Sequence, residues 1–131
     1  MAGKLSPSAQ QKIAQLELFA PRVARIHTLV ETLAVTKGST DNVTSQLKRA
    51  ADQLKLTFMT AGYDALSQIC GTIVMTAARA GSPGAKVRIL REHVGSLKFQ
   101  LELMVRTVTR EDLEAQARRQ KQQEEKAAPE E

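Results

Sequence analysis

Apolar residues recur along the chain at alternating steps of three and four, the spacing that places side chains on one face of an α-helix. The pattern appears in four stretches and is most regular in the last. The four stripes are Ile13, Leu16, Ala20, Val23, His27, Val30 and Ala34; Val43, Leu47, Ala50, Leu54, Phe58 and Ala61; Leu66, Ile69, Ile73, Ala77 and Ala80; and Val87, Leu90, Val94, Leu97, Leu101, Met104 and Val108. The first stripe is widened by Phe19, Ile26 and Leu33. Four amphipathic stripes predict an all-α fold, an up-down four-helix bundle whose core collects them.

Helix-breaking residues predict where the helices begin and end. Ser6 followed by Pro7 predicts an N-cap and a first helical position. Pro21 lacks a backbone N–H, so we expect it to kink or break the first helix. The Ala-Gly-Ser-Pro-Gly run at 80–84 predicts a loop.

Gly62 leaves two alternatives open for the middle of the chain. Residues 40–80 form either two helices that meet near Gly62 or one unbroken helix, which would give three long helices instead of four. An offset of 43 residues aligns Leu54 with Leu97 and Lys55 with Lys98. This alignment favours two similar helical hairpins, although leucine at helical spacing also recurs by chance in any bundle.

The C-terminal part of the chain differs in character from the rest. Thr109 and Asp112, an alcohol and an acid three residues apart, resemble a capping box that would restart or continue the helix. Beyond Leu113 the apolar stripe ends. We therefore predict a helical bundle domain at residues 1–110 and a polar, charged helical extension at residues 111–131 that frays into a disordered tail.

Composition favours a helical core and an intracellular setting. Aromatic residues make up only 3% of the chain and tryptophan is absent, so the core must be aliphatic and rich in alanine. No apolar run is long enough to span a bilayer, and the N-terminus has no apolar signal region. The single cysteine, Cys70, cannot form an internal disulfide. We expect a cytoplasmic protein without a membrane partner.

The charge is uneven along the chain. The net charge is +5. Residues 1–110 hold fifteen Lys/Arg and seven Asp/Glu, a balance of +8, while residues 111–131 hold four and seven, a balance of −3. A basic body suggests an anionic partner, either nucleic acid or an acidic protein. The alternative is a solvated bundle with a lysine-rich surface, which composition alone does not distinguish from the first.

Six bases lie off the apolar stripes of the second and fourth predicted helices and should project outward. They are Lys48, Arg49, Lys55, Arg88, Arg91 and Lys98. Outward bases neutralise phosphates without reading sequence. Of the four aromatic side chains, we expect three in the core, so base-specific recognition is not expected. We predict these six bases as a nucleic-acid-binding site.

Residues suited to catalysis or metal binding are scattered. His27, His93 and Cys70 fall on three predicted helices without the paired spacing of a zinc site. His93 suggests the His-x-x-Lys-Gly pattern of phosphorelay bundles, but Ser96 stands where the lysine is required. We predict no metal site, no cofactor and no enzymatic activity, and His27 as a core or boundary residue.

Two stretches resemble a known superfamily of small four-helix bundles. "TSQLKRAA" at 44–51 is similar to the Ser-Gln-Leu-Arg-Arg-Ala-Ala stretch of proteins encoded in 23S rRNA intervening sequences. Residues 77–106 resemble the central helix–loop–helix of the accessory variability proteins of diversity-generating retroelements. The Asn-Ile-Ala-Glu-Gly run of the first group and the Gly-Trp ending of the second are missing. The resemblance implies a basic bundle that assembles as a ring and binds RNA together with a protein partner such as a reverse transcriptase.

Together these observations lead to one expected function and one alternative. We expect a non-enzymatic accessory protein that binds nucleic acid, RNA in preference to DNA, without base specificity, beside a protein partner and as a homo-oligomer. The alternative is a scaffold for protein–protein interaction or oligomerisation that has no role with nucleic acid.

Overall fold

The computed structural model describes residues 4–127, which form five α-helices and no β-strand. The helices are α1 (Pro7–Glu17), α2 (Ala20–Val35), α3 (Asp41–Ala61), α4 (Asp64–Ala78) and α5 (Pro83–Ala127). The predicted all-α class is confirmed. Contacts divide the chain into two compact units, residues 18–101 and the described parts of the two ends, residues 4–17 with 102–127.

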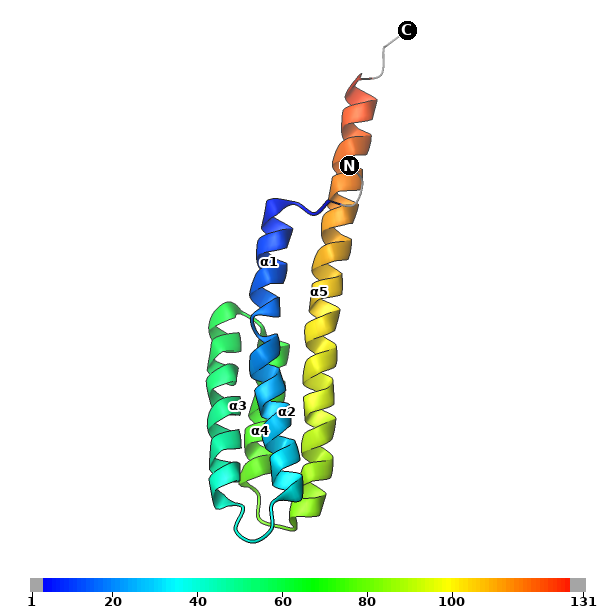
Figure 1. Ribbon diagram of the computed structural model, residues 1–131. Coiled ribbons are helices and arrows are strands. Elements are labelled where there is room, and N and C mark those ends of the chain that lie inside the picture. Colours follow the sequence, from blue (N-terminus) through cyan, green and yellow to red (C-terminus); the bar gives the residue numbers. More distant parts are fainter. Residues whose placement is uncertain (1–3, 128–131) are drawn as a thin grey trace. The chain divides into compact units, whose positions relative to one another are not determined.

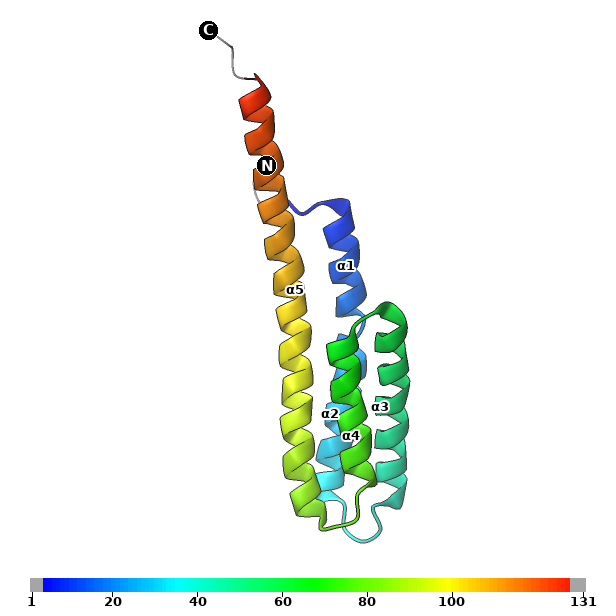
Figure 2. The same cartoon turned by 180° about the vertical axis from the view of Figure 1, so that it is seen from behind.

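The unit at residues 18–101 is an up-down four-helix bundle made of α2, α3, α4 and the first part of α5. Figures 1 and 2 show α2 and α4 on opposite sides, each lying between α3 and α5. Consecutive helices run antiparallel, as the short connections require. Within the bundle, α3 and α5 therefore occupy diagonal corners.

The core of this bundle is aliphatic, as the low aromatic content predicts. Its fully buried large side chains include residues from each of the four predicted stripes. The phase of the stripes differs from prediction mainly at alanines, because Ala20, Ala34, Ala61 and Ala80 are exposed. Larger side chains occupy the core there: Phe19, Ile26 and Leu33, which widen the first predicted stripe, and Leu29. Burying those groups removes more apolar area from water than burying an alanine methyl does.

Residues 40–80 form two helices, which resolves the alternatives left open by the sequence. Gly62 ends α3 in the left-handed conformation, with φ at +84°. Its N–H donates to the carbonyl of Met59, and the N–H of Tyr63 donates to the carbonyl of Phe58. These bonds satisfy the last carbonyls of α3, which is why a glycine in this conformation stops a helix cleanly.

The first predicted stripe is divided into α1 and α2 near Pro21, as expected. Pro21 lies in the first turn of α2, where its missing N–H has no helical acceptor to lose. Phe19, the residue just before α2, packs into the core. Its ring centroid lies 4.8 Å from that of Phe58 and 6.2 Å from that of Tyr63, both in edge-to-face geometry.

The other unit pairs α1 with the second part of α5 (Figure 1). Asp112 joins them: its carboxylate accepts hydrogen bonds from the N–H and the hydroxyl of Ser6, at 2.9 and 2.5 Å. The hydroxyl of Ser6 also accepts from the N–H of Ala9, which confirms the predicted N-cap. At Thr109 the helix continues, one of the two predicted outcomes, and the Thr109 hydroxyl donates to the carbonyl of Val105 within α5.

The predicted charged extension is helical as far as Ala127. α5 runs without interruption through the boundary predicted between residues 110 and 111. The predicted disordered tail falls partly on residues 128–131, which lie outside the described residues.

Candidate nucleic-acid interface

All six predicted bases lie at the surface of the four-helix bundle. Arg49, Arg88 and Arg91 are exposed. The remaining three, Lys48, Lys55 and Lys98, are half-buried, which is typical of lysines whose aliphatic stems lie along a neighbouring helix. None of the six is withdrawn into the core, so their outward placement is as the stripes predict.

The structure separates the six into two groups of three. The α3 base group comprises Lys48, Arg49 and Lys55, and the α5 base group comprises Arg88, Arg91 and Lys98. Since α3 and α5 occupy diagonal corners, with α2 and α4 between them (Figures 1 and 2), the groups do not form one continuous surface.

The separation follows from the succession of two hairpins. α3 is the second helix of the first hairpin, and α5 is the second helix of the next. In an up-down bundle of four sequential helices, the second and fourth helices lie at diagonal corners. Accordingly, Lys55 lies against α4, where its Cε is 3.7 Å from the position of a Cβ on Gly71, while Lys98 lies against α2.

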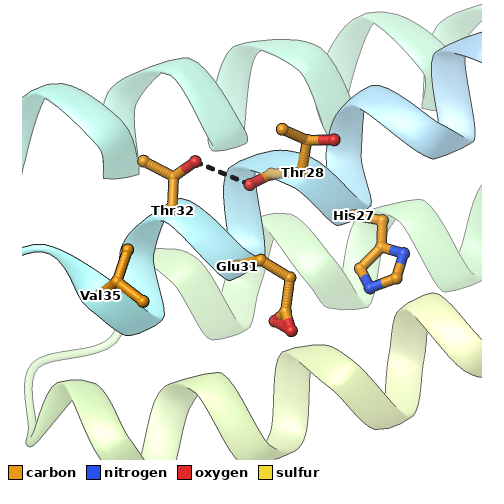
Figure 3. Close-up of a pocket in the computed structure, with 5 residues that line it drawn as sticks. All are labelled: His27, Thr28, Glu31, Thr32 and Val35. Carbon is orange, nitrogen blue, oxygen red and sulfur yellow. Dashed lines mark hydrogen bonds between the residues drawn. The ribbon is translucent and has the colours of Figure 1, made fainter.

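Arg91 in the α5 base group is paired with an acid. Its Nε lies 2.9 Å from a carboxylate oxygen of Glu31 on α2, the one ion pair found among residues 4–127. Figure 3 shows Glu31 pointing towards α5. The hydrogen bond from Arg91 lowers the pKa of Glu31, and the same bond raises the pKa of Arg91. Both side chains remain about half exposed, at 53% and 44%, so the guanidinium still reaches solvent.

Lys98 is held by His27, one turn of α2 away from Glu31. The Nζ of Lys98 lies 2.6 Å from Nδ1 of His27. An ammonium group only donates, so Nδ1 of His27 is the acceptor in this bond. His27 is half-buried, which confirms its prediction as a boundary residue. His27 and Glu31 also line a depression of about 420 Å³ on α2 (Figure 3), with Thr28, Thr32 and Val35.

Phe99 is the aromatic side chain that does not enter the core. It is 56% exposed, whereas Phe19 and Phe58 are buried and Tyr63 packs against Phe19. Phe99 follows Lys98 directly and lies eleven residues, or three helical turns, after Arg88. The α5 base group thus has an exposed aromatic ring beside it. In the sequence, the exposure of Phe99 is indicated by its position off the apolar stripe that contains Leu97 and Leu101.

Two further exposed bases, Arg22 and Arg25 on α2, were missed by the sequence reasoning. A guanidinium nitrogen of Arg22 donates to the hydroxyl of Thr57 on α3 at 3.1 Å. The prediction covered bases on the second and fourth helices only. The positions of Arg22 and Arg25 next to the buried Val23 and Ile26 place both arginines off the core face.

Neither a cluster of metal ligands nor an activated thiol is found among the described residues. Across residues 4–127, His, Cys, Asp and Glu side chains nowhere gather in threes close enough to hold a metal ion. Cys70 is buried, and loss of solvation raises the pKa of its thiol to about 12. In the same part of the chain, no helix combines the length and apolarity needed to cross a membrane.

The chain matches no protein-family model, no curated protein and no solved structure. The resemblance to the 23S rRNA intervening-sequence proteins and the accessory variability proteins therefore stays a prediction from the residues quoted above.

Proposed function

We propose that this protein is a non-enzymatic accessory protein that binds single-stranded nucleic acid, RNA in preference to DNA, without base specificity. The observation that carries the proposal is the exposed ring of Phe99 beside the α5 base group. Proteins that bind single strands combine bases that contact the phosphates with aromatic rings on which the nucleobases stack. One ring stacks on any base, so this arrangement supports binding without sequence preference.

The charge of the bundle supports the same ligand. Residues 18–101 contain eleven Lys/Arg and five Asp/Glu, an excess of six positive charges. Between residues 83 and 101 the balance is four bases to one acid, Glu92. Such a surface attracts a polyanion before any specific contact forms.

The three bases differ in what they can supply. Arg88 has no hydrogen-bond or ion-pair partner among the described residues, so it is free to contact a phosphate. Arg91 has donors left over after its Nε binds Glu31, since a guanidinium carries five. Lys98 keeps two of its three ammonium protons for a ligand.

The wider parts of the proposal rest on the residue-level resemblance. These are the preference for RNA, a protein partner such as a reverse transcriptase and assembly as a homo-oligomer. The proposed cytoplasmic location rests instead on the single cysteine and the lack of a long apolar run in the sequence. The α3 base group, on the opposite side of the bundle, stays a predicted second contact region. Because Phe58 on α3 is buried and no exposed ring among the described residues lies beside these bases, we propose that this group contributes much less to affinity than the α5 base group.

Binding to a fluorescently labelled single-stranded RNA of mixed sequence tests the proposal. The variant Arg88→Glu/Arg91→Glu/Lys98→Glu should lose at least about tenfold in affinity, because three phosphate contacts become repulsions. Phe99→Ala should lose roughly five- to 150-fold in affinity, because stacking on one aromatic ring contributes about 1–3 kcal/mol.

The matched control is Lys48→Glu/Arg49→Glu/Lys55→Glu, which makes the same change in net charge on α3. It should weaken RNA binding much less than the α5 variant does. If the two variants lose affinity equally, the attraction is unlocalised and the assignment to α5 is wrong. If the unaltered protein retains no RNA at low salt, the proposed function is wrong.

A further inference from the structure

The strongest feature outside the α5 surface is a groove between α3 and α4. It has a volume of about 520 Å³, and its residues come from both helices. Its lining includes Lys55 and Met59 on α3 and Gly71 and Met75 on α4, with Asp64 near the start of α4 and three polar residues between Asp64 and Met75. We call these eight residues the α3–α4 groove.

The groove exists because position 71 has no side chain. The stem of Lys55 crosses this position, and its Cδ and Cε lie 3.8 and 3.7 Å from where a Cβ of residue 71 would be. The floor is therefore the methylene chain of Lys55 lying on the backbone of α4. The ammonium group of Lys55 donates to no side chain or carbonyl among residues 4–127, in contrast to Lys98, which binds His27.

Two methionines form the rims. Met59 is 52% exposed and Met75 is 63% exposed, one on each helix. Leu56, which follows Lys55, is also exposed and continues the apolar surface on α3. Exposed methionines adapt their shape to an apolar partner, and they are frequent at sites that bind helices.

The charged and apolar groups of the groove determine which kind of ligand is complementary to it. A cation lies between two apolar rims, and Lys48, seven residues before Lys55, lies on the same face of α3. A complementary surface has apolar groups on both sides of a carboxylate. Phosphate backbone offers no apolar groups for Met59 and Met75. An amphipathic helix offers both the apolar groups and the carboxylate, because its positions i, i+3, i+4 and i+7 share one face.

We propose that the α3–α4 groove docks an amphipathic helix of a protein partner, with a carboxylate of that helix facing Lys55 and apolar residues against Met59 and Met75. This inference does not depend on the RNA-binding proposal, which concerns the opposite side of the bundle.

The test uses the full chain with isotope-labelled methionine methyl groups and a synthetic amphipathic helix of about five turns. The peptide has a leucine face with a central Glu, and two further versions carry Gln or Lys at that position. The Glu peptide should bind saturably and shift the methyl signals of Met59 and Met75 while leaving that of Met104 in place. It should bind at least about tenfold more tightly than the Lys peptide.

Charge exchange makes the test specific. Lys55→Glu should reverse the order, so that the Lys peptide binds more tightly than the Glu peptide. Lys37→Glu, an exposed loop position with the same change of charge, should leave the order as it was. Lys55 and Lys37 are not core residues, so both variants should keep the helical circular dichroism of the original.

Three results would overturn the docking site. The first is no saturable binding of the Glu peptide, and the second is binding that leaves Met59 and Met75 unperturbed. The third is a homo-oligomer that becomes a monomer in Met59→Glu/Met75→Glu, since a second copy would then occupy the groove. RNA affinity, measured on the same Lys55→Glu sample, should change little, so failure of this site and failure of the proposed function are separable.

Discussion

Cys70 shows how burial determines the chemistry of a single side chain. The thiol lies in the core of the bundle, and desolvation raises its pKa to about 12. A thiol in that environment stays protonated and is a poor nucleophile at neutral pH. This cysteine therefore has a packing role in the folded protein.

The raised pKa of Cys70 predicts a dependence of stability on pH. In the unfolded chain the thiol loses its proton near pH 9, but in the folded protein it keeps the proton until about pH 12. The folded state thus binds more protons in this window, and the free energy of unfolding should fall as pH rises above 9. The contribution is at most about 1.4 kcal/mol per pH unit. Denaturant unfolding at pH 8 to 10.5 measures it.

Cys70→Ala is the control for this effect. It should be less stable at pH 8 because it leaves a small cavity, but its stability should fall less steeply as pH rises. Equal slopes for the two proteins would contradict the assignment to Cys70.

Glu31 competes with phosphate for Arg91, and removing it should strengthen RNA binding. In Glu31→Gln the guanidinium of Arg91 loses its acid partner, so we expect an increase in RNA affinity of up to about fivefold, the range of exposed ion pairs. Glu92→Gln removes one acid from the neighbourhood without releasing a base and serves as the control. A gain no larger than that of the control would show that Arg91 does not contact the ligand.

At the scale of elements, periodicity predicted the helices well but their phase less well. The stripe of α5 was correct from Val87 to Leu101, because large aliphatic residues occupy every core position there. On α2, Ala20 and Ala34 were wrongly predicted to face the core, since a small side chain is compatible with both the core and the surface. The hydrogen bonds of Asp112 to Ser6 could not be predicted, because they join residues 106 positions apart.

Two glycines in helical regions should respond to alanine in opposite directions. Gly62→Ala should lower the free energy of unfolding by about 1–2 kcal/mol, because residue 62 has a positive φ that a Cβ disfavours. Gly95→Ala should raise it by up to about 1 kcal/mol, because Gly95 lies inside α5 with open space at its Cβ. Denaturant unfolding of both variants tests the boundary between α3 and α4. Equal changes in the free energy of unfolding for the two variants would contradict a helix boundary at Gly62.

Asp112 should hold residues 4–6 against α5. The hydroxyl of Ser6 lowers the pKa of this carboxyl, so the contact should persist at neutral pH and weaken as acid protonates Asp112. In Asp112→Asn the backbone amide of Ser6 should exchange its hydrogen faster than in the original protein. Glu111→Gln, a neighbouring exposed acid, should leave that exchange rate unchanged; a slow amide in both variants would rule out the contact.

At the scale of the whole molecule, the sequence predicted the bundle but not the arrangement of its bases. All six predicted bases are at the surface because the large aliphatic residues of the stripes occupy the core. Their division into two groups depends on which helices are neighbours, and that follows from how two hairpins pack. The exposure of Phe99 and the open groove at Gly71 are likewise properties of packing between helices.

The most direct measurement is the salt dependence of RNA affinity, because contacts with phosphates release counterions. If the α5 base group makes three such contacts, the slope of log affinity against log salt should include about −2 from these residues, at roughly −0.7 per contact for a single strand. Arg88→Glu/Arg91→Glu/Lys98→Glu should therefore show a slope shallower by about two, while Lys48→Glu/Arg49→Glu/Lys55→Glu keeps most of it. A slope that is unchanged in the α5 variant would contradict the account.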